Sequence, residues 1–212
     1  MSLYVKQLQL GDMQNFVYLV GAKDSPETAI IDAAWDVPAA LRAAEADGRK
    51  VTAALFSHHH FDHVNGLPEI LARGGIRPYA HAADIGKLAP ELQKEVTPLG
   101  DVQVGPLTVK AMHTPGHTPG SSCFHAGDAL FSGDTVFVNA CGRCDLAGGD
   151  PEEMFKSLQR VAQLPAEMTL YPGHDYGDVP VSSIEREKQN NPYFQKLASL
   201  TDFVAWRMRP RR

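Results

Sequence analysis

Short apolar runs of strand length recur along the chain, separated by turns rich in glycine, aspartate and proline. Such runs, bounded by turn residues, are typical of β-strands. One of them, residues 51–56, has almost no polar position, which predicts a strand buried on both faces. The predicted strands cover residues 5–10, 16–20, 28–31, 51–56, 78–81, 107–112, 121–125, 129–131 and 168–171.

Segments of helical composition lie between several of these strands. Residues 39–46 are rich in alanine and end at Gly48, and residues 151–164 follow Asp150 and begin with Pro151, which is typical of a helix N-terminus. Further helices are expected at residues 66–73, 82–88, 184–189 and 193–206. Strands and helices alternate too irregularly for a doubly wound sheet. We therefore expect an α/β (α+β) fold in which helices cover the outer sides of two sheets.

The composition favours a globular protein that binds neither nucleic acid nor membrane. The chain has 212 residues and a hydrophobic fraction of 43%, which suits one packed domain. The net charge of -5 argues against nucleic acid as the main partner, and no stretch approaches the roughly 20 apolar residues of a membrane-spanning helix. Three cysteines and an N-terminus unlike a signal peptide predict a cytoplasmic location. The basic run 207–212 is expected to be a solvated end, and the residues do not indicate an oligomeric state.

A cluster of histidines follows the predicted buried strand directly, in the segment Ser57-His58-His59-His60-Phe61-Asp62-His63. Alternate side chains of an extended segment point the same way, so we expect His58 and His60 to face one point and His59 to face away. Asp62 and His63 come after a bend and are expected to face a second point nearby. A loop that leaves a buried strand can hold such side chains on a rigid scaffold.

Three more candidate metal ligands stand singly, each at a strand end and beside a glycine: His117, Asp134 and His174. Imidazole and carboxylate together suit zinc, and also iron or manganese. Two metals about 3.5 Å apart need a shared carboxylate, for which Asp134 is the natural candidate. His81, His113 and His125 lack this pattern and are expected to be structural or surface histidines. Asp32 is expected either to support a ligating histidine or to form a turn.

Four motifs resemble the metallo-β-lactamase superfamily, in the expected order from Asn15 to His174: His58-x-His60-x-Asp62-His63, Thr114-Pro115-Gly116-His117-Thr118, Gly133-Asp134-Thr135 and Gly173-His174. The resemblance implies a four-layer αββα sandwich formed by residues 1–212 as a single domain, with a short helical extension from about residue 182. It implies two divalent metal ions, with Zn2+ ahead of iron or manganese. The implied ligands are His58, His60 and His117 for one metal and Asp62, His63 and His174 for the other, with Asp134 between them.

The same resemblance implies a hydrolytic mechanism. A hydroxide shared by the metals would attack a carbonyl carbon, while the metals lower the pKa of the bound water that gives the hydroxide and polarise the carbonyl oxygen. Asp62 would orient the hydroxide and Asp134 would bridge the metals, so both are expected to be catalytic. The sequence shows no serine or cysteine elbow that would supply a nucleophilic side chain instead.

Two further segments resemble the branch of this superfamily that contains hydroxyacylglutathione hydrolases and persulfide dioxygenases: Cys141-Gly142-Arg143-Cys144-Asp145 and Gly173-His174-Asp175-Tyr176. The resemblance implies that Arg143 and Tyr176 bind the substrate and that the enzyme hydrolyses a thioester, which includes glutathione conjugates. Asp145 stands where an aromatic residue is usual, and the segment after His174 is short. Both departures weaken the expectation that the thiol is glutathione.

The persulfide dioxygenases give an alternative from a different reaction class. In them two histidines and one carboxylate hold a single Fe2+, and the matching residues are His58, His117 and Asp134. The substrate would then be glutathione persulfide. Lactonase or β-lactamase activity also stays open, and a metal-binding module without turnover is a third class. The pair Cys141-x-x-Cys144 leaves a redox role open for its loop.

Overall fold

The side chains of strand β2 (Asn15–Ala22) enter two different hydrophobic cores in the computed structural model, which describes residues 2–209. Phe16 and Tyr18 point into a core between two sheets, whereas Val17 points into a core that helices complete. Alternate residues of a strand face opposite sides of a sheet. A strand that is apolar throughout therefore needs cover on both sides, and this requirement explains the layers of the molecule.

The first sheet has six strands in the order β1-β2-β3-β4-β5-β6. The pairs β1–β2 and β2–β3 are antiparallel, and the pairs from β3 to β6 are parallel. The carboxyl ends of β3 and β4 therefore meet at one edge, where the chain continues into Asp32 and the histidine segment. The strands are β1 (Leu3–Leu10), β2 (Asn15–Ala22), β3 (Glu27–Ile31), β4 (Lys50–Leu55), β5 (Arg77–Ala80) and β6 (Thr97–Pro98).

The second sheet has six strands in the order β14-β13-β10-β9-β8-β7, and a separate ribbon pairs β11 with β12. Strands β8, β10 and β13 run in one direction, because β9 is antiparallel to β8 and β10 while β13 is parallel to β10. Their carboxyl ends lead to His117, Asp134 and His174. The strands are β7 (Val102–Val104), β8 (Leu107–His113), β9 (Ser122–Ala126), β10 (Ala129–Gly133), β11 (Val136–Phe137), β12 (Ala140–Cys141), β13 (Thr169–Pro172) and β14 (Ser182–Ser183).

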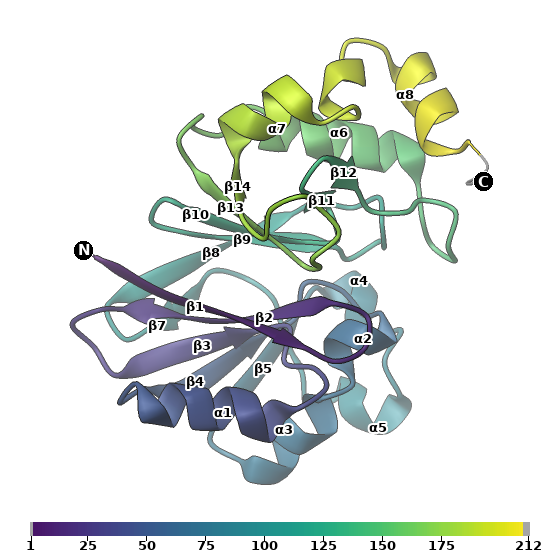
Figure 1. Ribbon diagram of the computed structural model, residues 1–212. Helices are drawn as coiled ribbons and strands as arrows, with labels where there is room; N and C mark the ends of the chain where they lie inside the picture. The colour runs from purple at the N-terminus through teal and green to yellow at the C-terminus, as the bar shows by residue number, and fades with distance from the viewer. Residues whose placement is uncertain (1, 210–212) are drawn as a thin grey trace.

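Helices cover the outer face of each sheet, so the layers follow the order helix, sheet, sheet, helix (Figure 1). Buried residues of α1 and α3 complete a core on the first sheet, and those of α6, α7 and α8 complete one on the second. The sandwich expected from the sequence is confirmed. The helices are α1 (Val37–Ala46), α2 (Phe61–Val64), α3 (Leu67–Arg73), α4 (Ala82–Ile85), α5 (Pro90–Gln93), α6 (Pro151–Val161), α7 (Ile184–Asn190) and α8 (Leu200–Arg207), with a 3-10 turn η1 (Phe194–Lys196).

Helix starts follow their capping side chains. The carboxylate of Asp150 accepts a hydrogen bond from the backbone N–H of Glu152 at 2.8 Å, as predicted for the start of α6. Helix α1 begins at Val37, before the predicted start, because Asp36 accepts a hydrogen bond from the N–H of Ala39 at 2.9 Å. Capping thus extends the helix to residues that lack the alanine-rich composition.

The C-terminal part differs from its prediction. The single helix expected at residues 193–206 is wrong, because the chain forms η1 and then starts α8 at Ser199, whose hydroxyl accepts from the N–H of Asp202 at 3.3 Å. Strand β14 follows β13, so residues 168–171 are not the last strand. Strands β6, β7 and β14 have only two or three residues, which is too short for a periodic pattern in the sequence. They form through pairing with neighbouring strands.

The prediction that the basic run 207–212 is solvated is wrong for its first residue, Arg207. Arg207 closes α8 with 4% of its surface exposed, and its Nη1 lies 3.3 Å from the hydroxyl of Tyr193. Residues 210–212 of the same basic run lie outside the described residues.

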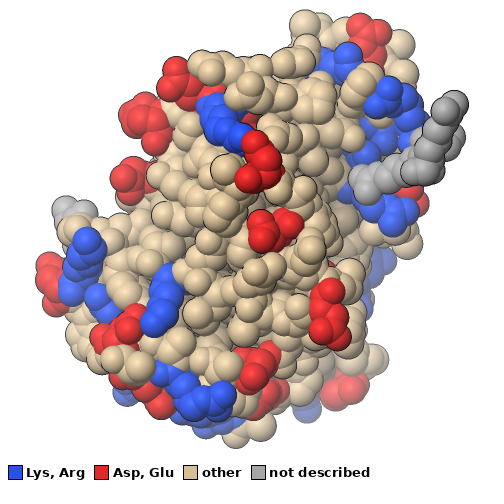
Figure 2. Space-filling model, in the orientation of Figure 1, with Lys and Arg blue, Asp and Glu red and all other residues tan. Residues whose placement is uncertain are grey.

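Acidic and basic side chains are mixed over the face shown in Figure 2, and basic ones gather beside the C-terminal helix. Over residues 2–209, none of the helices combines the length and the apolar character that crossing a bilayer requires.

Candidate metal centre

The histidine segment leaves β4 at the edge of the first sheet and turns into the short helix α2. His58 and His60 precede this helix, whereas Asp62 and His63 lie within it. His60 is extended, with φ -61° and ψ 144°, and is the N-cap of α2. The change from extended to helical backbone turns the later pair toward another point. The groups in which these side chains lie agree with the predicted division into two pairs, and a further group that joins His58, His63 and Asp134 connects the pairs.

Three imidazoles form the first cluster, ligand group 1, in which the ligand nitrogens lie within 4.8 Å of one another: His58, His60 and His117. Nε2 of His58 lies 3.1 Å from Nδ1 of His60. His117 donates from Nδ1 to the carbonyl oxygen of Arg143 at 2.8 Å, which leaves its Nε2 for the group. Nδ1 of His58 lies 3.0 Å from Oγ of Ser57, so this ring is also fixed from outside.

A second cluster, ligand group 2, combines a carboxylate with two imidazoles within the same 4.8 Å limit: Asp62, His63 and His174. Nδ1 of His63 lies 2.9 Å from Oδ2 of Asp32, and Nδ1 of His174 lies 2.9 Å from the carbonyl oxygen of Met13. The two Nε2 atoms therefore face each other at 3.1 Å. Outer contacts of this kind set the ring orientation of metal-binding histidines.

The conformation and the contacts of Asp32 agree with both roles that the sequence left open. Its φ of 52° lies in the left-handed region, which is typical of a turn. Its carboxylate also accepts hydrogen bonds from the N–H and the hydroxyl of Ser57, both at 2.7 Å, and contacts His63. Asp32 is thus joined to both ends of the histidine segment.

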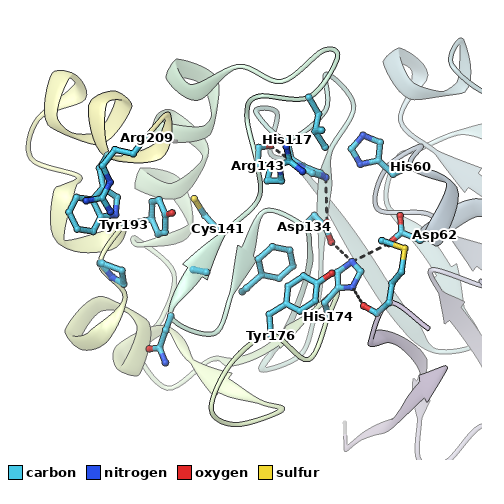
Figure 3. Close-up of a pocket in the computed structure, with 17 residues that line it drawn as sticks. His60, Asp62, His117, Asp134, Cys141, Arg143, His174, Tyr176, Tyr193 and Arg209 are labelled. Atoms are coloured by element: carbon cyan, nitrogen blue, oxygen red, sulfur yellow. Dashed lines mark hydrogen bonds and ion pairs between the residues drawn. The ribbon is translucent and has the colours of Figure 1, made fainter. Parts of the chain in front are cut away.

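Asp134 lies between the two ligand groups. Its Oδ2 is 3.4 Å from Nε2 of His117 in group 1, and its Oδ1 is 3.3 Å from Nε2 of His63 in group 2. A Cβ at Gly173 would lie 2.6 Å from Oδ1, so this approach of Asp134 requires glycine there. Figure 3 shows the carboxylate of Asp134 between His117 and His174. This is the arrangement expected of a bridging ligand.

The two ligand groups differ in charge. Burial lowers the pKa of His58 well below its ordinary value, lowers the pKa of His60 to about 4 and also lowers the pKa of His117. In ligand group 2, burial disfavours the protonated form of the two imidazoles, but the neighbouring carboxylates have the larger, opposite effect. They raise the pKa of His63 well above its usual range and the pKa of His174 to about 9. Positive charge is thus favoured beside the carboxylates, where a cation would replace these protons.

Two buried atoms at the centre of the site have no hydrogen bond to any part of residues 2–209: Nε2 of His117 and Oδ1 of Asp134. Buried polar atoms are nearly always satisfied, and exceptions are typical of functional sites. Imidazoles and carboxylates directed at two adjacent points fit two divalent ions of the zinc type. The residues therefore suit the cofactors expected from the sequence.

The remaining histidines lie outside the ligand groups, as expected. His59 faces away, with its Nδ1 2.9 Å from Oδ2 of Asp84. His113 and His125 each contact a backbone carbonyl oxygen through Nε2, at 2.8 and 2.9 Å. His81 caps α4, because its Nδ1 accepts from a backbone N–H at 3.3 Å. These rings have structural partners of their own.

Asn15 contributes to the site although the sequence analysis did not single it out. Its Nδ2 donates to Oδ2 of Asp62 at 3.0 Å, and its Oδ1 accepts from Nε1 of Trp35 at 2.9 Å. Asn15 thereby fixes the carboxylate of Asp62. A single asparagine at the start of a strand carries no motif, so only its position after the turn could have drawn attention to it.

A cavity of about 720 Å³ extends from the ligand groups toward the C-terminal helices (Figure 3). Its lining combines ligand residues with apolar side chains and cations, among them Phe137, Leu146, Trp206, Arg143 and Arg209. Tyr176 also lines it, and its ring stacks on His174 at 4.5 Å with an interplanar angle of 9°. Both residues predicted to bind the substrate, Arg143 and Tyr176, therefore lie at this cavity.

The family profile described as the Metallo-beta-lactamase superfamily matches residues 10–174. The chain belongs to the metallo-beta-lactamase superfamily. The matched range contains both ligand groups and Asp134.

Several members of the superfamily are similar to this chain. A probable polyketide biosynthesis zinc-dependent hydrolase, BaeB, from Bacillus velezensis is 32% identical over 205 residues, which cover 92% of this chain and 88% of that protein. A hydroxyacylglutathione hydrolase from Fuscovulum blasticum is 40% identical over 166 residues, which cover 77% of this chain and 64% of that protein. The chain thus spans less than two thirds of the latter. The crystal structure of ETHE1 from Myxococcus xanthus has a TM-score of 0.84 at 28% identity and covers 98% of this chain and 92% of that chain.

These similarities confirm the metallo-beta-lactamase fold, the class of metal-dependent hydrolase and divalent metal ions, zinc first, as cofactors. The roles given to single residues, including the metal ligands and the catalytic Asp62 and Asp134, stay predictions.

Proposed function

We propose that this metallo-beta-lactamase-fold enzyme hydrolyses thioesters, with Asp134 joining the two ligand groups at the floor of the cavity. The observation that carries the proposal is the position of the Asp134 carboxylate, which directs Oδ2 at His117 and Oδ1 at His63, at 3.4 and 3.3 Å. A shared carboxylate is the element that allows two metals to act on one substrate. The curated relatives with hydrolase names support the same chemistry.

The reaction adds water across the acyl carbon–sulfur bond. The water oxygen bonds to the acyl carbon, the carbon–sulfur bond breaks, and the thiolate leaves and takes up a proton. When bound at the ligand groups, divalent ions supply hydroxide at neutral pH and polarise the carbonyl oxygen. The side chain of Asp62 is held by Asn15 and stays ionised, because hydrogen bonds from His174 and Asn15 outweigh burial and lower its pKa. Asp62 can therefore accept a hydrogen bond from the nucleophile and orient it.

The substrate proposed is the thioester of an elongated thiol, including glutathione conjugates. The cavity of about 720 Å³ is large enough to hold more than an acyl group, and its lining includes ligand residues, apolar residues, Trp206 and Arg209. Tyr176 and Arg143 line the cavity, and the hydroxyl of Tyr176 would donate a hydrogen bond to the substrate. The relative named hydroxyacylglutathione hydrolase supports this class of substrate.

The test combines metal analysis with thioester cleavage. The natively expressed enzyme should contain about two equivalents of metal per chain and cleave S-lactoylglutathione or a longer acyl thioester. The Asp134→Ala variant should lose more than about 100-fold in kcat/KM and retain less metal. Glu45→Gln is a matched control, because it removes a carboxylate from the exposed ion pair with Arg73, away from the cavity. A fully metal-loaded enzyme that cleaves no thioester would contradict the proposal.

A second candidate function is persulfide oxidation at a single iron. It is supported by the similarity to ETHE1, which extends over 98% of this chain and includes the C-terminal helices. The iron would be held by His58, His117 and Asp134. This candidate predicts one equivalent of iron per chain and oxygen uptake with glutathione persulfide. An iron-loaded enzyme that consumes no oxygen with any persulfide would exclude it.

A cytoplasmic location belongs to the same proposal. None of the three cysteines forms a disulfide within residues 2–209, and all three are buried, which suits a reducing compartment. Fractionation of the source cells tests this expectation, and recovery of the enzyme outside the cytoplasm would contradict it.

A further inference from the structure

The carboxylate of Asp84 lies outside both ligand groups but contacts two of the segments that supply ligand group 1. Asp84 belongs to α4 and is 1% exposed. Its Oδ2 accepts hydrogen bonds from the N–H of His59 at 2.9 Å and from Oγ1 of Thr118 at 2.7 Å. Its Oδ1 accepts from the N–H of Gly120 at 2.7 Å. The side-chain Nδ1 of His59 is a further close contact at 2.9 Å.

These partners are direct neighbours of metal-ligand candidates. His59 lies between His58 and His60, and Thr118 follows His117. Asp84 therefore connects both sources of ligand group 1, although it contacts none of the three imidazoles itself. No equivalent contact of Asp84 reaches ligand group 2 among the interactions of the described chain.

The two segments come from different sheets. The histidine segment follows β4 of the first sheet, whereas His117 follows β8 of the second sheet. The distance between them depends on how the sheets pack, unless a side chain ties the segments together locally. Asp84 provides such a tie, because one carboxylate accepts hydrogen bonds from both sides.

The fit around Asp84 leaves little room for adjustment. A Cβ at Gly120 would lie 2.5 Å from Cγ of Asp84, so the loop can approach the carboxylate only with glycine at this position. Thr118 and Ser121 also contact each other through their hydroxyls at 2.8 Å. The loop that follows His117 is therefore held by a connected set of polar contacts centred on a buried carboxylate.

We propose that Asp84 is a positioning residue for ligand group 1: it fixes the spacing between the His58–His60 segment and His117, and so sets metal affinity at that group alone. Asp84 contacts neither the metal position nor the substrate cavity. The inference concerns metal binding, and its readout does not depend on which substrate the enzyme cleaves.

The test is a titration of the metal-free enzyme with Co2+, followed by absorption spectroscopy, for the wild type, Asp84→Asn and Asp84→Ala. Loss of an outer contact of this kind typically weakens metal binding about 10- to 100-fold. We expect this weaker binding for one of the two equivalents of Co2+, and an unchanged affinity for the other equivalent. Asparagine keeps one acceptor oxygen, so the Asp84→Asn variant should bind Co2+ more tightly than the Asp84→Ala variant. If the Asp84→Ala variant is well folded and binds both equivalents of Co2+ with the wild-type affinities, the proposal is wrong.

The matched control is Glu187→Gln. Glu187 is also fully buried, and it accepts from the N–H of Asn139 at 2.8 Å and from Nδ2 of Asn191 at 2.9 Å, away from both ligand groups. The control should lower the melting temperature without changing either Co2+ affinity. If it weakens one affinity as strongly as the Asp84 variants do, the effect is general destabilisation and the proposal is wrong.

Thr118→Val keeps the proposal testable if the Asp84 variants do not fold. Valine removes only the hydroxyl that donates to Asp84 at 2.7 Å and keeps the size of the side chain. We expect a several-fold loss of Co2+ affinity, again at one equivalent only. Unchanged Co2+ binding in Thr118→Val would count against Asp84 as a positioning residue.

Discussion

The guanidinium of Arg143, which lines the cavity, is paired with the carboxylate of Asp145, two residues further along the chain. Nε of Arg143 lies 3.0 Å from Oδ1 of Asp145 and Nη2 lies 2.9 Å from Oδ2. The cation that was predicted to bind the substrate therefore already has an acidic partner. Asp145 is also the residue at which the sequence departs from the hydroxyacylglutathione hydrolase pattern, so the departure has a direct electrostatic consequence.

Replacing Asp145 should improve the binding of anionic substrates. Asp145→Asn releases the guanidinium of Arg143 and removes the negative charge beside this cation. Both side chains of the pair are nearly half exposed, so the effect should be modest, about two- to fivefold in KM for an anionic thioester, with kcat unchanged. Steady-state kinetics on an anionic and a neutral thioester measure the difference. Glu153→Gln, which breaks the exposed pair with Lys156, is the control. Equal KM changes for both substrates would contradict this account.

The hydroxyl of Tyr176 is expected to matter for substrate binding and not for metal binding. Tyr176→Phe keeps the ring that stacks on His174 and removes only the hydroxyl. Loss of one hydrogen bond to the substrate should raise KM about two- to tenfold, while metal content stays the same. A KM equal to that of the wild type would show that this hydroxyl does not bind the substrate.

Metal removal should lower the stability of the enzyme. Without cations, ligand group 2 keeps imidazoles and carboxylates together at a buried site, and metal that binds only the folded state stabilises it. At free zinc about 100 times the Kd, the contribution to the free energy of unfolding is about 2.7 kcal/mol. For a chain of this size that corresponds to roughly 5–10 °C in melting temperature. Calorimetry before and after chelation measures the shift, and re-addition of zinc should reverse it. An unchanged melting temperature would mean that the ligand groups are stable without metal.

The thiol of Cys144 should be unreactive in the folded enzyme. Burial raises the pKa of Cys144 to about 11, and the reactive species is the thiolate. Because the folded pKa is raised, only about one thiol in a thousand is ionised at pH 8, and reactivity should increase as the pH rises toward 11. Titration with a chromogenic disulfide at pH 8 should label this thiol rapidly only after unfolding. Rapid labelling of the native enzyme, or a Cys141–Cys144 disulfide, would support the redox interpretation instead.

Local sequence patterns were enough to predict most of the larger elements. Apolar runs identified the long strands, and Asp150 with Pro151 identified the start of α6. Elements that exist only through a neighbour were missed, such as β14, which is two residues long and pairs with β13. The predicted helix at residues 193–206 was wrong, because Ser199 caps a new helix in the middle of a segment with helical composition throughout.

The sequence by itself determined the chemistry available to this protein. The alternation of His58 and His60, the position of Asp62 and His63 after them, and glycine beside the single ligands are local features, fixed by backbone geometry within a few residues. Such features indicate a two-metal site before any long-range contact is known.

The tertiary structure decided how these ligands are held and what surrounds them. The contacts from Asp32 to His63, from Asn15 to Asp62 and from Asp84 to Thr118 join residues more than 25 positions apart. The first two join neighbouring segments of the first sheet, and the third joins segments that belong to different sheets. No spacing in the sequence encodes any of them. Side-chain orientation decided the pairing of Arg143 with Asp145 in the same way, because a spacing of two residues allows the contact but only the folded loop places the two groups together.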